Sequence, residues 1–191
     1  VGLGASIAPL DFAVNLAFPA MTEAFALPTA DIRWVAVCYV ITYGSLMLYC
    51  GALGDRLGHL RVFRWGLFIS ALGMAACALS PAYGWLLAGR VLQGIGVALT
   101  LSCAPALAMS LLAFEQRTLA LSAYGAMIAV AGLMAPLLGG ISMLYWGWAG
   151  VYGFRVPIVL LALLCTPLLS SRLRVQKPST PDATQPGSVQ G

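Results

Sequence analysis

Residues 51–61 read GALGDRLGHLR, from Gly51 to Arg61, and form a short charged break between two long apolar runs. The run before this break covers residues 34–54, and the run after it covers residues 62–80. A helix needs about 20 mostly apolar residues to cross the hydrocarbon core of a bilayer. The two runs therefore predict a helical membrane hairpin whose charged turn lies on one side of the bilayer.

The rest of the chain extends this pattern. Hydrophobic residues make up 61% of the 191 residues and charged residues only 8%, whereas a soluble domain carries about 25% charged residues. We therefore expect an all-α membrane protein, a bundle of six transmembrane helices in one domain over residues 1–171. A polar segment rich in Ser, Thr, Pro and Gln follows at 172–191, and its composition predicts a disordered cytoplasmic linker or tail. The six predicted spans are 1–21, 34–54, 62–80, 84–111, 119–142 and 151–170.

The basic residues predict how the bundle is oriented. Arg33 lies on one side, with Arg155 at its edge, whereas most of the other basic residues outside the spans gather on the opposite side. These are Arg56, Arg61, Arg64, Arg117, Arg172, Arg174 and Lys177. The positive-inside rule puts the richer side, and with six spans both termini, in the cytoplasm. Topology thus accounts for the net charge of +4, and we expect the partner to be the lipid bilayer rather than nucleic acid.

The start of the chain has two interpretations. A signal peptide is disfavoured, because no basic residue precedes the first apolar run and Asp11 interrupts it. A chain that starts at Val1 inside an apolar run instead suggests a fragment of a longer protein.

Nothing in the sequence favours enzyme chemistry. The chain has one His, and it lacks the HExxH, GxSxG and phosphate-loop patterns. Its five Cys lie inside apolar runs without a CxxC pair, so we expect no metal and no cofactor.

Two ionisable residues inside predicted spans are the candidate site. Asp11 lies about 15 Å along the first span, near the middle of the bilayer, and Asn15 follows one helical turn later. Burial favours the neutral form of a carboxyl group, so Asp11 could exchange a proton. Arg90, with Gln93 one turn on, lies early in the fourth span and must pair, snorkel or face water. A structural hydrogen bond for Asp11, or a snorkelling Arg90, remains the alternative.

The fifth span carries two neighbouring rows of small residues. Ala131, Ala135 and Gly139 recur every four residues, and Gly132, Pro136 and Gly140 do the same one position further round. Small residues at this spacing allow helix backbones to approach closely, and Pro136 can kink the helix.

Several of these segments resemble motifs of the major facilitator superfamily. Residues 51–61 resemble its loop motif G-x-L-a-D-r-x-G-r-k, and they fall between the second and third spans as in that family, with His59 and Leu60 in place of the usual basic pair. The other three resemblances are weaker. Residues 87–96 resemble its fourth-helix motif R-x-x-q-G-x-g, and residues 132–140 its fifth-helix antiporter motif G-P-x-x-G-G. Residues 10–19 resemble the first-helix motif L-D-x-T-x-x-N-x-A-L-P of drug:proton antiporters, with the Asp-to-Asn spacing one residue short and the Thr absent.

The resemblance implies the N-terminal six-helix half of a transporter, closest to the fourteen-helix drug:proton antiporter branch. By that likeness Gly51, Asp55, Arg56, Gly58 and Arg61 form a cytoplasmic gate, with Asp55 meeting a helix of the other half.

The same likeness assigns roles inside the bilayer. Asp11, Asn15, Arg90 and Gln93 belong to the proton and substrate pathway, and Gly132, Pro136, Gly139 and Gly140 shape and seal the cavity. The proton gradient would drive efflux of a drug-like or amphipathic small molecule across the bacterial inner membrane, together with a C-terminal half. A small-metabolite uniporter or exporter, and a truncated inactive six-helix fragment, remain alternatives.

Overall fold

The structure is a computed structural model that describes residues 1–28, 30–110 and 116–168. Within these ranges every regular element is a helix, as an all-α membrane protein requires. The end of the predicted domain at residue 171 and the predicted tail at 172–191 lie outside the described residues.

The first span is a broken helix. It runs over Gly2–Ala24 but divides into α1 (Gly2–Ala5), the 3₁₀ helix η1 (Pro9–Ala13) and α2 (Val14–Ala24). Pro9 has no backbone N–H to continue the α1 hydrogen bonds and stands at the start of η1. Asp11 therefore lies in a tightened turn at the middle of the span, the type of irregular segment that often marks a functional position.

The next three spans follow the predicted order. They are α3 (Trp34–Leu57), α4 (His59–Ala78) and α5 (Tyr83–Ser110), within a few residues of the predicted bounds. Between α3 and α4 only Gly58 leaves the helical conformation, at φ 91° and ψ 124°. A side chain at this positive φ would be strained, so glycine permits the tight hairpin.

The last two spans meet at a glycine. The segment α6 (Arg117–Gly153) is interrupted at Gly147, whose φ of 62° and ψ of −159° are not helical. Beyond it the chain is helical again and continues through α7 (Arg155–Leu164), because Phe154 and Cys165 keep helical angles and donate to the carbonyls four residues earlier. We call residues 148–168 the sixth span; its length of about 20 residues suffices to cross a bilayer. The predicted break at 143–150 is thus confined to one residue.

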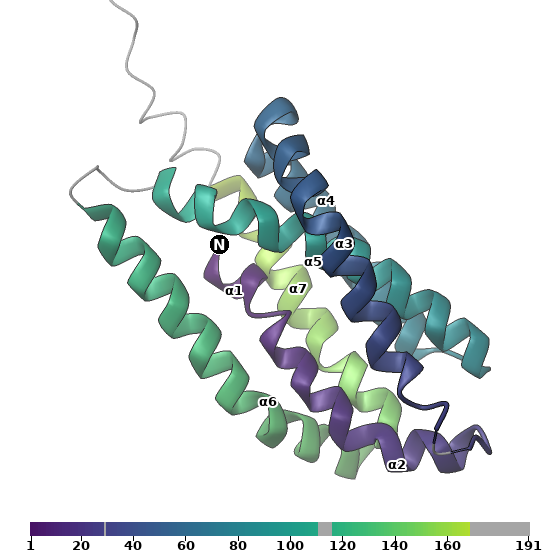
Figure 1. Cartoon of the computed structure of the whole chain (residues 1–191). Coiled ribbons are helices and arrows are strands. Elements are labelled where there is room, and N and C mark those ends of the chain that lie inside the picture. Colours follow the sequence, from purple (N-terminus) through teal and green to yellow (C-terminus); the bar gives the residue numbers. More distant parts are fainter. Residues whose placement is uncertain (29, 111–115, 169–191) are drawn as a thin grey trace, which may run out of the picture.

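The helices make this a multi-pass integral membrane protein. Five described segments are long and apolar enough to cross a membrane by length and composition, and Arg155–Leu168 is a shorter apolar helix that belongs to the sixth span. Figure 1 shows α6 along one side, α3, α4 and α5 on the other, and the first span with α7 between them. The sixth span thereby brings Arg155 into the interior of the bundle.

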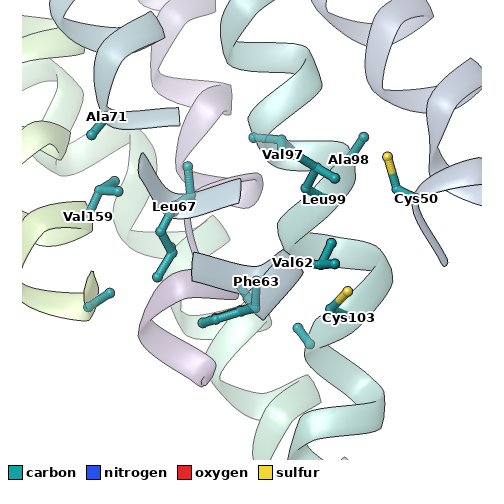
Figure 2. Close-up of a cluster of buried hydrophobic side chains, with 14 of the residues drawn as sticks. Cys50, Val62, Phe63, Leu67, Ala71, Val97, Ala98, Leu99, Cys103 and Val159 are labelled. Atoms are coloured by element: carbon teal, nitrogen blue, oxygen red, sulfur yellow. The ribbon is translucent and has the colours of Figure 1, made fainter. Parts of the chain in front are cut away.

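The core holds α4 against α5. Figure 2 shows Phe63 and Leu67 of α4 beside Val97 and Leu99 of α5, with Val159 of the sixth span nearby. The backbones are very close at Gly96, where a Cβ atom would clash with the backbone N of Ser70. This close packing fixes α5, and with it Arg90, relative to its neighbours.

Candidate functional site

The centre of the site is an ion-pair cluster around Asp11. Nη2 of Arg90 lies 2.7 Å from Oδ2 of Asp11, and Nη1 of Arg155 lies 2.6 Å from Oδ1. The side chain of Asp11 is 10% exposed and both guanidinium groups are 1% exposed. One carboxylate therefore ties the first span to α5 and to the sixth span in the interior of the bundle.

Arg90 makes the most contacts in the cluster. Its Nη1 donates to Oδ1 of Asp11 and to Oε1 of Gln93, both at 2.8 Å, and its Nε donates to the carbonyl of Val35 at 2.7 Å. Nε2 of Gln93 donates in turn to Oδ1 of Asp11 at 3.1 Å. The structure thus brings together three of the four predicted pathway residues, and Arg90 is paired rather than snorkelling.

Aromatic rings enclose the two guanidinium groups. The Cζ atom of Arg90 lies 4.4 Å from the ring centre of Tyr39 and 5.7 Å from that of Tyr152. Arg155 lies 5.4 Å from the ring of Tyr152. Separations below about 6 Å allow a cation–π attraction, which offsets part of the cost of removing these cations from water.

Arg155 was not among the predicted site residues. The sequence predicts that Arg155 lies at the outer edge of the last span, but the structure buries it completely. The reason is the start of the sixth span: the helix begins at residue 148, so Arg155 lies about two turns inside it. The general rule that an arginine inside an apolar helix needs a partner would have identified it.

A cavity of about 150 Å³ opens beside the cluster. Asp11, Asn15, Tyr39, Tyr43 and Arg90 supply its polar lining. Asn15 therefore faces the same space as Asp11, as their spacing predicts. The hydroxyl of Tyr39 is buried and has no hydrogen-bond partner among the described residues, so one residue of the lining carries an unused polar group.

The cluster holds more positive charge and more donors than its single carboxylate can match. Two cations face one anion, and Nη2 of Arg155 is buried without an acceptor among the described residues. Oδ1 of Asp11 already accepts from Arg90, Gln93 and Arg155. In this arrangement the charged form of Asp11 is favoured, and a proton can bind there only if the arginines loosen their hold.

The charged loop motif lies at the other end of α3. Asp55 is largely exposed, and its Oδ1 lies 3.3 Å from Nε2 of His59, its one ion-pair partner among the described residues. Gly58 forms the turn at positive φ, whereas Gly51 has open space around its Cα. The described residues place no acidic side chain beside Arg56 or Arg61 in an ion pair.

The two small-residue rows of α6 differ in their packing. Ala135 and Gly139 are buried, and a Cβ atom on Gly139 would lie 2.6 Å from Cβ of Ala13 in η1. In the second row Pro136 is exposed and Gly140 has nothing within 4 Å of a built Cβ. The first row therefore packs tightly on the segment that holds Asp11. The second row is more open, and a Cβ atom on its Gly132 would only reach Cβ of Pro9, at 3.8 Å.

No group of three or more possible metal ligands occurs in residues 1–28, 30–110 and 116–168. The site consists of charge pairs, amides and tyrosines, which can bind protons or polar ligands and can hold helices together.

Comparison with known proteins matches nearly the whole chain to one family. The profile described as Major Facilitator Superfamily matches residues 1–189. The chain is 33% identical over 175 residues to the methylenomycin A resistance protein of Bacillus subtilis (strain 168), covering 91% of this chain and 38% of that protein. The lincomycin resistance protein of Streptomyces lincolnensis is 31% identical over 159 residues, covering 82% of this chain and 32% of the relative.

A third relative is named as a transporter of a vitamin and not as a resistance protein. The riboflavin transporter RibZ of Clostridioides difficile (strain 630) is 25% identical over 162 residues, covering 84% of this chain and 36% of RibZ. The chain therefore spans about a third of the length of these relatives.

Proposed function

The chain belongs to the Major Facilitator Superfamily, and from that premise we propose that the whole protein exports a drug-like or amphipathic small molecule in exchange for protons. Two of the relatives above are named as antibiotic resistance proteins, and the first-span and fifth-span motifs resemble those of drug:proton antiporters. The proposal places the protein in the bacterial inner membrane with both termini of this chain in the cytoplasm, acting together with a C-terminal half.

The observation that carries the proposal is the position of Asp11. Its carboxylate pairs with Arg90 and Arg155 from two other spans and also lines a cavity. A proton on Asp11 removes the charge that holds these two cations, so protonation would release three helices from one another. A contact that exists in one protonation state and not in the other is what couples a proton to a change of conformation.

The remaining predicted residues have supporting roles in this proposal. Arg90 sets how readily Asp11 takes up a proton, Gln93 orients the carboxylate, and Asn15 faces the substrate. Gly51, Asp55, Arg56, Gly58 and Arg61 form the cytoplasmic gate. The more open row of Gly132, Pro136 and Gly140 faces the other half, and Gly139 holds α6 against η1. The proton gradient supplies the energy, and no cofactor takes part.

The test uses everted membrane vesicles that contain the full-length transporter, with wild type compared with Asp11→Asn. Uptake is measured for coumarin dyes that carry an acidic, a neutral or a basic substituent, with and without a proton gradient that is acidic inside. We expect gradient-driven accumulation of at least one dye in wild type and its loss in Asp11→Asn. The matched control is Glu23→Gln, an exposed carboxyl outside the cluster, which should behave as wild type.

A specific observation also supports an uncoupled transporter of a small metabolite. The two arginines favour a permanently charged Asp11, which would then be a structural ion pair. In that case wild-type dye movement would be indifferent to the gradient, and Asp11→Asn would reduce the amount of folded protein instead. Gradient-driven uptake that survives in Asp11→Asn would remove Asp11 from the proton pathway.

A further inference from the structure

The buried cluster has an unmatched positive charge. Asp11 is the single acidic side chain in ion-pair contact with Arg90 or Arg155 among the described residues. An uncompensated charge in a medium of low dielectric constant is costly, unless an anion approaches it or water reaches it. The cluster as a whole therefore carries a net positive charge, and it lies beside a cavity that Asp11 and Arg90 line.

The hydrogen-bond inventory points the same way. An arginine side chain has five N–H donors. Arg155 uses one to the carbonyl of Val151 and one to Asp11, and its Nη2 has no acceptor in the described residues. Arg90 uses four, two of them on Oδ1 and Oδ2 of Asp11. Asp11 therefore does not satisfy all the donors of the two arginines, and at least one buried N–H donor, on Nη2 of Arg155, has no acceptor among the described residues.

The cavity reaches the cluster at Asp11 and Arg90, which both line it. Arg90 lines the cavity together with Tyr39, whose buried hydroxyl also has no partner among the described residues, whereas Arg155 lies outside this lining. A ligand in the cavity can thus replace Asp11 as a partner of Arg90 while Arg155 keeps Asp11 paired. The second arginine supplies the charge that permits this exchange.

We propose that the cavity beside Asp11 binds the acidic group of an anionic substrate through Arg90 and the hydroxyl of Tyr39. Arg155 is then the positioning residue, because it stays paired with Asp11 and compensates its negative charge. This inference rests on the proposed transport function and assigns its substrate class. It also gives the Asp11–Arg90 ion pair a second means of release besides protonation of Asp11. An anion bound to Arg90 competes with Asp11 for the guanidinium group and weakens the pair. A cationic substrate would meet the net positive charge and is disfavoured.

The test measures binding, so it does not depend on proton coupling. The purified full-length transporter is titrated with three probes at constant ionic strength, and the thermal unfolding midpoint is followed. The probes are coumarin-3-carboxylate, its neutral carboxamide, and a coumarin that carries a protonated primary amine on a CH₂ group. We expect saturable stabilisation by the carboxylate and weaker or no stabilisation by the other two. Equal stabilisation by the cation, or no stabilisation by the carboxylate, overturns the proposal.

Three variants test whether the net charge of the cluster determines carboxylate binding. Arg155→Gln leaves a neutral Asp11–Arg90 pair and should weaken carboxylate binding about tenfold or more, whereas Asp11→Asn leaves two unmatched cations and should tighten it by a similar factor. Arg155→Lys, which keeps the charge, should restore most of the affinity. A merely structural role for these residues would weaken binding in both of the first two variants, and that result contradicts the inference.

A matched pair of tyrosine variants tests the geometry without changing charge. Tyr39 and Tyr152 both have buried hydroxyls without a partner in the described residues, and both rings lie near Arg90. Only Tyr39 lines the cavity. Tyr39→Phe should weaken carboxylate binding severalfold and Tyr152→Phe should not; the reverse order would place the anion elsewhere. If the variants bind the carboxylate as expected but the protein shows no gradient-driven transport, the anion site stands and the proposed exchange for protons is wrong.

Discussion

Arg90 shows how far a single residue type determines this site. Its three nitrogen atoms reach three different partners: both oxygens of Asp11, the amide oxygen of Gln93 and the backbone carbonyl of Val35. Only a planar guanidinium group can hold a carboxylate with two bonds and still donate to a third group behind it. A lysine at this position keeps the charge and loses the geometry.

We therefore expect Arg90→Lys to reduce transport by the full-length protein about tenfold or more, because the loss of charge-assisted hydrogen bonds leaves Val35 and Gln93 without their donor. The measurement is the initial rate of gradient-driven dye uptake in everted vesicles, normalised to the amount of folded protein. Arg33→Lys, at an exposed arginine near the start of α3, is the control and should stay within twofold of wild type. Wild-type rates for Arg90→Lys would mean that charge alone suffices.

Sequence reasoning identifies two of the three charges and misses the third. Asp11 and Arg90 are identified because each interrupts an apolar run where an ionisable group is costly. Arg155 obeys the same rule, but the Gly and aromatic residues around 147–153 resemble an interfacial loop. Only the backbone angles at Gly147 show that the loop is a single residue. The pairing itself depends on which helices are neighbours, and periodicity along one helix does not contain that information.

At the level of elements, two interruptions position the site. The 3₁₀ turn at Pro9–Ala13 places Asp11 in the first span, and the break at Gly147 starts the sixth span early enough to bury Arg155. The sequence predicts the number and approximate bounds of the spans, because apolar length is a strong signal. It does not predict either interruption, since Pro9 lies among small and apolar residues and Gly147 is one of several nearby glycines.

The break at Gly147 leads to a prediction about stability. Its combination of φ 62° and ψ −159° is accessible almost only to glycine, so Gly147→Ala should destabilise the fold by roughly 1–3 kcal/mol. The full-length protein should show a lower thermal unfolding midpoint and weaker coupling of Arg155 to Asp11. Gly153→Ala is the matched control, because Gly153 lies in the same helical segment with nothing within 4 Å of a built Cβ. Equal midpoints for the two variants would count against a fixed break at Gly147.

At the scale of the whole molecule, the orientation of the bundle in the membrane can be tested. Leu57 lies at the end of α3 and is 50% exposed, and Ala82 lies exposed before α5 at the opposite end of α4. If the basic residues determine topology, Leu57→Cys is cytoplasmic and Ala82→Cys is external. In intact cells a membrane-impermeant maleimide should label Ala82→Cys above the parental background and label Leu57→Cys only after the cells are opened. Labelling of Leu57→Cys in intact cells would invert the bundle and with it the proposed gate.

In the proposed function, the transport cycle depends on contacts beyond this chain. Asp55 is 74% exposed, and its one ion-pair partner among the described residues is the imidazole of His59 in the next turn. A charged side chain of this type is available to a partner, and in the proposal that partner is the N-terminus of a helix in the other half of the transporter. Such a contact stabilises one state of the cycle and leaves the substrate cavity, at the far end of α3, unchanged.

Asp55→Asn should therefore slow turnover about five- to tenfold while the carboxylate probe still binds with wild-type affinity, because the energy of one helix-end contact biases the two states by about that factor. Steady-state uptake and the thermal titration, measured on the same preparation, separate the two effects. Glu23→Gln removes an exposed carboxylate from α2 and should change neither quantity. If Asp55→Asn instead lost binding while remaining folded, the loop at 51–61 would act on the cavity, and the division of the chain into a gate and a site would be wrong.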